Sequence, residues 1–432
     1  MKLQKNVIIF VSAAITALIF ISYFFINSEP VKRFAIIDIS ASAVFLLFCY
    51  VLIKYSISAK KILILIGIGI AVRLIFVNIL PIGSDDVYRY MWDGKVQSNG
   101  INPYLFTPDS PQLAKLTSDI LPAKVNYPDM KTIYFPLSQW MFYICFQISG
   151  ESIWAYKLLI LLYELLTFYS IFLLLKKLNI DPKFILFYVL CPLPIIQFAI
   201  DSHLDAFGLP LLLLSFYFYF DRKIIISAVF LGLSLSIKPV GLVIIPIFFL
   251  NEKRLIDRLK VSVIPFLVFF VEFLPYIFST NPFDAFFIYT KNWYFNGLIF
   301  NTLNSLFHNN QTSRLICAII LIITLIPIYF NRMKTEEKIY YSVLLLFIFS
   351  PVVHPWYLAW ILILIPVVRR WSGILFVTLS SLTVFTILTY KLDGIWKDYW
   401  PVLFVEYLPV FGFLIWELFF LNKTKKREIN PA

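Results

Sequence analysis

Long apolar runs separated by short polar segments recur along the whole chain of 432 residues. A window of about 20 mostly apolar residues is what an α-helix needs to cross a hydrocarbon core of about 30 Å. The runs therefore predict a series of helices that alternate across a membrane. Their ranges are 7–26, 35–53, 62–80, 155–175, 184–200, 205–220, 224–237, 239–250, 261–278, 314–330, 339–352, 355–367, 372–389 and 404–421.

Some of these apolar segments are too short for a full bilayer crossing, namely 224–237, 239–250, 339–352 and 355–367. Each pair of short helices meets at one turn. Irregular backbone at membrane depth is tolerated only where it lines protein or water. The pattern thus predicts a cavity that dips into the membrane from the side of those turns.

Composition supports a lipid-facing exterior, because 60% of the residues are apolar, only 14% are charged, and the chain contains 45 Phe. A soluble chain of this length would need a more polar surface. The fold class expected is an all-α polytopic membrane protein. The four cysteines are scattered without metal-binding or disulfide spacing, so they are interpreted as small core residues.

The net charge of +12 comes from short basic clusters between the apolar runs, which is the pattern of cytoplasmic loops rather than of a nucleic-acid groove. The clusters lie at 2–5, 54–61, 176–183, 222–223, 253–260, 332–334, 369–370 and 423–427. This places both termini in the cytoplasm and the loops 81–135 and 279–312 outside. Segment 136–149 must then be re-entrant or interfacial, because a full crossing would invert everything after it. The predicted location is the cytoplasmic membrane, with multiple passes.

The segment Ser84–Gly100, SDDVYRYMWDGKVQSNG, follows an apolar run and is unusually polar. One interpretation is an ordinary surface helix with Ser84 as N-cap, Asp85 paired with Arg89, and Gly100 at its end. One face of that helix would carry Asp86, Tyr90, Asp93 and Gln97. The other interpretation makes Asp85 and Asp86 candidates for acid–base chemistry, and a surface helix could hold such a base over a cavity.

Three further segments with ionisable residues fall at the predicted outer turns. Asp201, His203 and Asp205 are either solvated turn residues or functional groups, and together they could hold a metal weakly, although no metal is required. Lys238, in SIKPVG, is suited to pair with an anion such as a phosphate. His354 lies between Pro351 and Pro355 and could donate to a phosphate, with Trp356 and Tyr357 beside it to contact a sugar or lipid. An aromatic belt with an incidental histidine is the alternative.

These motifs, DDVYRYMWDGKVQSNGINPY, then IYFPLSQ, SHLDAFG, IKP and SPVVHPWYLAW, resemble bacterial mannosyltransferases of the GT-C glycosyltransferase superfamily over about residues 60–370. The resemblance implies a single domain over 1–432 with about 12–14 transmembrane helices, and juxtamembrane helices in the first outer loop. It implies a polyprenyl-phosphate sugar donor and a lipid or glycan acceptor. It assigns the catalytic acid to Asp86, with Asp85 supporting or alternate, and phosphate binding to Lys238, His354 and, less directly, Arg89.

The hypothesis is transfer of a hexose, with mannose the first choice, to an acceptor hydroxyl outside the membrane, with inversion and without a required cofactor. Asp86 would act as general base, while Lys238 and His354 would stabilise the leaving phosphate as cations. A transporter or flippase is the alternative from another class, although such folds usually contain internal repeats. A lipid-linked oligosaccharide polymerase or ligase is the alternative among enzymes.

Overall fold

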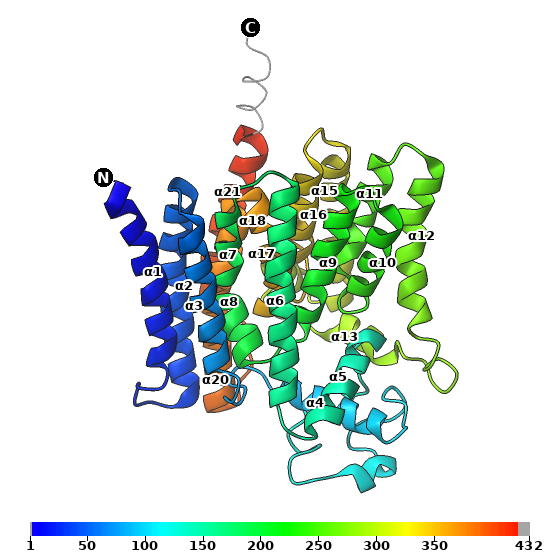
Figure 1. Cartoon of the computed structure of the whole chain (residues 1–432). Helices are drawn as coiled ribbons and strands as arrows, with labels where there is room; N and C mark the ends of the chain where they lie inside the picture. The colour runs from blue at the N-terminus through cyan, green and yellow to red at the C-terminus, as the bar shows by residue number, and fades with distance from the viewer. Residues whose placement is uncertain (1, 422–432) are drawn as a thin grey trace.

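A computed structural model describes residues 2–421, with the side chains of residues 9–419, and shows an all-helical bundle (Figure 1). The N-terminal part consists of α1 (Lys2–Ser22), α2 (Pro30–Lys54) and α3 (Ala59–Ile75). Pro30 begins α2, at a position where the missing N–H has no partner to lose. After α3 the chain forms α4 (Asp86–Ser98), the 3₁₀ turn η1 (Pro111–Leu116) and α5 (Pro136–Ser149).

The centre of the chain is a run of long and short helices. They are α6 (Trp154–Lys177), η2 (Pro182–Ile185), α7 (Leu186–Val189), α8 (Pro192–Pro194), the π-helical turn η3 (Ile195–Ile200), α9 (Asp205–Phe220), α10 (Ile224–Leu235), η4 (Pro239–Val243), α11 (Ile245–Asn251) and α12 (Leu255–Val271). The predicted span 184–200 is bent by 45° between α7 and α8, where Pro192 follows the break.

The C-terminal part contains α13 (Asp284–Asn292), α14 (Leu298–Phe307), α15 (Asn310–Phe330), α16 (Thr335–Ile348), η5 (Pro355–Leu358), α17 (Ala359–Leu362), α18 (Ile365–Val368), α19 (Trp371–Leu379), η6 (Ser380–Thr383), α20 (Val384–Asp393), α21 (Trp400–Trp416) and η7 (Glu417–Leu421). The segment 279–312 is therefore two short helices rather than a plain loop. Its contacts with the rest of the bundle include isolated β-bridges of Phe295 and Asn296 with Val352.

The fold is that of an all-α polytopic membrane protein. Within residues 2–421, five helices are long and apolar enough to cross a membrane, or six if the bent pair is one span. They are Pro30–Lys54, Trp154–Lys177, Asn310–Phe330, Trp371–Asp393 and Trp400–Phe419. Shorter apolar helices, such as Asp205–Phe220 and Ile224–Leu235, coincide with other predicted spans. The larger number of 12–14 crossings stays a prediction.

The two ends of the bundle differ in what they carry. Figure 1 shows α4 and α5 at the lower end, whereas α2 and α6 finish, and α12 begins, at the upper end. The basic clusters at 54–61, 176–183 and 253–260 belong to the loops at those upper helix ends. The clusters at 2–5 and 423–427 lie outside the residues whose side chains are described. Segment 136–149 is α5, which packs beside α4 at the lower end, and its re-entrant or interfacial position stays a prediction.

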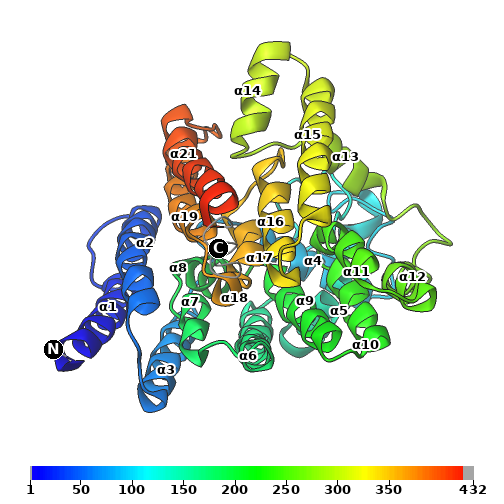
Figure 2. The ribbon, with the colours of Figure 1, turned by 90° about the horizontal axis from the view of Figure 1, so that it is seen from above.

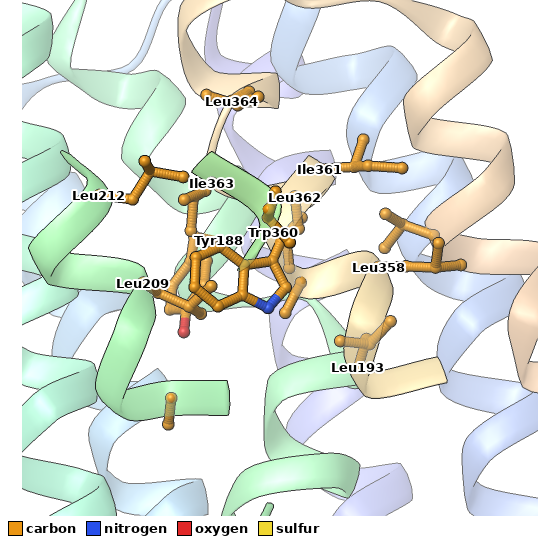
Figure 3. Close-up of a cluster of buried hydrophobic side chains, with 14 of the residues drawn as sticks. Tyr188, Leu193, Leu209, Leu212, Leu358, Trp360, Ile361, Leu362, Ile363 and Leu364 are labelled. Carbon is orange, nitrogen blue, oxygen red and sulfur yellow. The ribbon is translucent and has the colours of Figure 1, made fainter. Parts of the chain in front are cut away.

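The packed core of the bundle surrounds the short helices α17 and α18, which lie in its middle in Figure 2. Trp360 is fully buried there among leucine and isoleucine side chains, including Leu209 and Leu358 (Figure 3). Gly208 of α9 lies directly against the Trp360 ring, where a Cβ would collide with it. The close approach fixes the indole nitrogen at the edge of the core, next to the beginning of α9.

The contact between α4 and α5 also depends on a glycine. A Cβ on Gly94 would lie 2.5 Å from the carbonyl oxygen of Phe142, which is backbone and cannot rotate away. We expect Gly94→Ala to destabilise the protein by about 1–3 kcal/mol, because α4 and α5 would have to separate. Thermal unfolding of the purified protein in detergent measures this. Gly67→Ala on α3, where the Cβ meets nothing within 4 Å, is the control. Equal melting temperatures for the two variants would contradict the expectation.

Candidate active site

A cavity of about 290 Å³ lies at the α4 end of the bundle. Segments that are far apart in the sequence form its wall: 83–90, 126–135, 204–205, 237–239, 286–295, 354–357, Tyr390 and Trp396. The predicted cavity at the turns between paired short helices is confirmed, since both Lys238 and His354 line it. Of the other predicted site residues, the lining includes Asp85, Asp86, Arg89, Tyr90, Asp205, Trp356 and Tyr357.

Asp86 is the first residue of α4 and opens onto the cavity, with its side chain 20% exposed. Its Oδ1 accepts a hydrogen bond of 2.8 Å from the amide of Asn126, and its Oδ2 lies 3.5 Å from Nδ1 of His203. Burial alone would raise the pKa of this carboxyl, but the His203 and Asn126 contacts outweigh it and lower the pKa below 3.8. The group is therefore a carboxylate at neutral pH.

Aromatic rings link this carboxylate to the second predicted histidine. The ring of His203 stacks on Trp356 with a centroid distance of 3.6 Å, and Trp356 stacks on His354 at 4.2 Å. Phe295 continues the stack on the far side of His354 at 4.8 Å. His203 and His354, 151 positions apart in the sequence, thus belong to one rigid column beside Asp86.

Burial lowers the pKa of His354 to about 3. The negative charge of Asp86 opposes this shift, and His203 and Lys238 add to it. The imidazole lies in the break between α16 and η5 and is neutral at pH 7. The expectation that His354 supplies a positive charge is therefore wrong, because a desolvated imidazolium next to a lysine is unfavourable. A neutral imidazole can still donate one hydrogen bond.

Lys238 lies in the turn between α10 and η4 and is held on two sides. Its Nζ donates to Oδ1 of Asp205 over 2.6 Å and lies 3.1 Å from the centre of the Tyr357 ring. The indole of Trp360 donates to the same Asp205 oxygen over 2.7 Å, which ties the pair to the core. Lys238, predicted to be the cationic partner of an anion such as phosphate, therefore lines the cavity already paired with Asp205.

The beginning of α4 differs in detail from the prediction. Asp85, not Ser84, occupies the N-cap position, and Ser84 Oγ accepts from the N–H of Asp86. Asp85 does not pair with Arg89. Its two oxygens accept from Lys391 of α20 over 3.0 and 2.9 Å, which joins α4 to the C-terminal helices.

Arg89 pairs with Asp93 instead, over 2.9 Å on the buried side of α4. Asp93 also accepts from the amide of Gln139 at 3.0 Å, and its side chain does not line the cavity. Asp93, predicted as a sugar-contacting or supporting residue on the Asp86 face of this helix, therefore lies in the contact between α4 and α5. Tyr90 does line the cavity, with its ring stacked on Phe142 at 4.5 Å.

Asp201, His203 and Asp205 do not converge on one point. Asp201 accepts from the backbone N–H groups of Ile82 and Gly83 over 2.8 and 2.9 Å, His203 faces Asp86, and Asp205 faces Lys238. Burial raises the pKa of Asp201. No group of three potential metal ligands occurs within the described part of the chain. The idea of a weak metal site at these three residues is therefore not supported by their geometry.

Sequence reasoning missed several cavity residues. Asn126 and Lys131 come from the first outer loop, Tyr289 and Trp293 from the second, and Trp396 from the loop before α21. Tyr289 contacts Tyr357 through their hydroxyls at 2.9 Å, and Tyr127 meets Trp293 edge-on at 5.1 Å. The many aromatic residues in the predicted outer loops could have indicated these positions, since rings with polar edges suit sugar binding.

A polytopic helical bundle with a cavity at one end, lined by an ionised carboxylate, lysines and aromatic rings, has the features of an integral membrane enzyme. The family model described as "Alpha-(1->6)-mannopyranosyltransferase, N-terminal domain" matches residues 16–252. The chain belongs to this MptA_B family. It is a glycosyltransferase that transfers mannose, as the resemblance predicted. No curated protein and no solved structure gives a match.

The matched region contains Asp86, Lys131, His203 and Lys238, whereas His354 and Trp356 lie beyond it. A transporter, a flippase and an oligosaccharide polymerase are set aside, because the family is one of mannosyltransferases. A sugar donor and an acceptor are its partners.

Proposed function

We propose that the protein transfers mannose from a polyprenyl monophosphate donor to an acceptor hydroxyl on the extracytoplasmic side of the membrane, with inversion. The observation that carries the proposal is the meeting of Asp86, Lys238 and His354, remote in sequence, in one cavity. A carboxylate opposite phosphate-binding groups is what displacement at an anomeric carbon bearing phosphate requires.

Asp86 acts as the general base in this scheme. The acceptor hydroxyl oxygen forms a bond to the anomeric carbon while the bond from that carbon to the phosphate oxygen breaks. The hydroxyl proton passes to Asp86, and the bonding electrons leave with the phosphate. Attack on the face opposite the phosphate inverts the anomeric centre. The Asn126 and His203 contacts keep Asp86 oriented and ionised between turnovers.

Lys238 and His354 bind the phosphate oxygens of the donor. Lys238 uses one N–H for Asp205 and lies against the Tyr357 ring, so part of its ammonium remains to donate toward the cavity. The neutral imidazole of His354 adds one further donor. The aromatic residues Trp356, Tyr357 and Trp293 give flat surfaces for the mannose and the acceptor.

The cavity end faces away from the cytoplasm in this proposal. The helix ends that carry the basic clusters at 54–61, 176–183 and 253–260 lie at the opposite end of the bundle. Positively charged loops are retained on the cytoplasmic side. A lipid-linked donor on the outer leaflet is then within reach, while a nucleotide sugar is not.

The direct test incubates the purified protein with radiolabelled polyprenyl-phosphate mannose and, separately, with nucleotide-activated mannose. Products are isolated with a mixture of short mannosides and lipid-linked glycans as acceptors. Transfer from the lipid donor alone, with an anomeric configuration opposite to that of the donor, supports the proposal. Transfer only from the nucleotide sugar, or with retained configuration, contradicts it.

A further inference from the structure

Most of the charged groups lining the cavity are paired with a group of opposite charge, either in the lining or behind it. Asp85 pairs with Lys391, Asp205 with Lys238, and Arg89 with Asp93, each within 3.0 Å. Each pair contributes little net charge to the cavity. Asp86 and Lys131 are the remaining charged lining residues, and neither has a Lys, Arg, Asp or Glu partner in the described part of the chain.

Lys131 differs from the other lining cations in having no hydrogen bond, ion pair or ring contact among residues 2–421. Its side chain is partly exposed on the cavity wall. A lysine in that setting can bind an incoming anion without breaking a contact. Arg89 and Lys238, in contrast, would bind it while still paired with Asp93 and Asp205. Electrostatic stabilisation is strongest from a charge that is already in place and not neutralised.

The backbone on both sides of Lys131 is held by the buried contacts between α4 and α5. Arg89 donates to the carbonyl oxygen of Met130 over 2.8 Å. Gln139 donates to Thr132 Oγ1 over 2.9 Å and to Asp93 over 3.0 Å. The ion pair of Arg89 with Asp93 closes this network. The network thus fixes residues 130 and 132, and with them the point from which the Lys131 side chain enters the cavity.

We infer that Lys131 is the residue that neutralises the charge developing on the leaving phosphate, and that the Arg89–Asp93–Gln139–Thr132 network positions it. The inference rests on the proposed function and deepens it. A donor phosphodiester carries one negative charge and the released polyprenyl phosphate about two, so the demand for a cation grows as the bond to the anomeric carbon breaks. Lys131 meets this demand from the wall of the same cavity, while Asp86 gains a proton in the same step.

The experiment measures steady-state transfer and inhibition by polyprenyl phosphate in wild type, Lys131→Gln and Lys131→Arg. We expect Lys131→Gln to lower kcat and to raise the inhibition constant of polyprenyl phosphate, each by about 10- to 100-fold. The acceptor KM stays unchanged, and Lys131→Arg recovers most of both losses. Product inhibition reports phosphate binding directly, and a merely structural role would not move it selectively.

Lys124→Gln is the matched control, because Lys124 lies on the same loop but contacts the Tyr88 ring and does not line the cavity. Its constants stay near wild type. Thr132→Val keeps the side-chain shape but removes the oxygen that accepts from Gln139, so we expect a smaller change in the same direction as Lys131→Gln.

The outcomes separate this inference from the proposed function. Wild-type protein that cannot use the lipid donor overturns both. Active wild type with an unchanged inhibition constant in Lys131→Gln overturns the role of Lys131 alone, and so does a rise confined to the acceptor KM. If kcat and the inhibition constant change in Lys131→Gln but not in Thr132→Val, the network does not position Lys131.

Discussion

Asp86→Asn is expected to reduce mannosyl transfer by about 10²- to 10⁴-fold, which is the usual contribution of general base catalysis. The amide keeps the size of the side chain and its contact with Asn126, but it cannot accept the acceptor proton. The measurement is the initial rate of transfer from polyprenyl-phosphate mannose under saturating donor and acceptor. Donor binding, followed by protection against thermal unfolding, should persist in the variant.

The control for this variant is Asp119→Asn, which removes a carboxylate from the same outer loop at an exposed position away from the cavity. Its rate should equal that of wild type. Turnover of Asp86→Asn within a factor of a few of wild type would remove Asp86 from the chemistry and direct attention to Asp85.

Lys238→Met should be the second most damaging change. It removes a phosphate donor and leaves the Asp205 carboxylate buried with only the Trp360 indole as partner. Leaving Asp205 without its cation lowers the stability of the protein. The lost hydrogen bond to the charged phosphate costs about 1.5–3 kcal/mol, which corresponds to roughly 10-fold to 150-fold in donor affinity. Isothermal or fluorescence titration of the purified variant with polyprenyl phosphate measures the change.

The double variant Lys238→Met with Asp205→Asn separates the binding of phosphate by Lys238 from its ion pair with Asp205. Asparagine removes the buried charge that the single variant leaves without a partner, so thermal stability should return. Donor affinity should remain low if Lys238 binds the phosphate. Recovery of affinity together with stability would show that Lys238 serves only to neutralise Asp205.

Mannosyl transfer should also depend on pH through the protonation of Lys238. Burial lowers the pKa of Lys238 from 10.5 to about 8, against the opposing charges of Asp205 and Asp86. The groups that face its ammonium are Asp205 and the Tyr357 ring. The ammonium is present below that pKa and is lost above it, so donor binding should weaken as pH rises through about 8. Lys238→Arg, whose guanidinium does not titrate there, should abolish this alkaline decline.

Much of the architecture could be predicted from local pattern. Apolar runs of membrane-crossing length, prolines such as Pro30 and Pro136 at helix starts, and Gly100 after α4 are read within one segment at a time. The paired short helices around Lys238 and His354 predicted a cavity because broken backbone in a membrane must line something. Asp85 and Asp86 became candidates for a similar reason, since carboxylates just outside an apolar run need a use, and the family resemblance then favoured Asp86.

Pairing between distant segments could not be predicted in this way. Asp85 reaches Lys391, 306 positions later, rather than Arg89 on its own helix, because the end of α20 packs beside the start of α4. Arg89 lies four residues from both Asp85 and Asp93, so helix periodicity allows an ion pair with either. The way α4 packs against α5 decides that Arg89 pairs with Asp93. Lys131 lies in no motif that the sequence singled out. It became a candidate only because the structure shows that the other cations of the cavity, Arg89 and Lys238, are paired with carboxylates.

The chain's amino-acid pattern by itself thus determined that this is a helical membrane protein, because charge is costly in hydrocarbon. It also placed the candidate groups Asp86, Lys238 and His354 at turns on one side of the predicted topology. Only the tertiary structure decided which ionisable groups form ion pairs with one another and which remain free to bind a substrate. Ion pairing depends on distances of a few ångströms between segments hundreds of residues apart, and these are set by how the helices pack, through contacts such as Gly94 against Phe142 and Gly208 against Trp360.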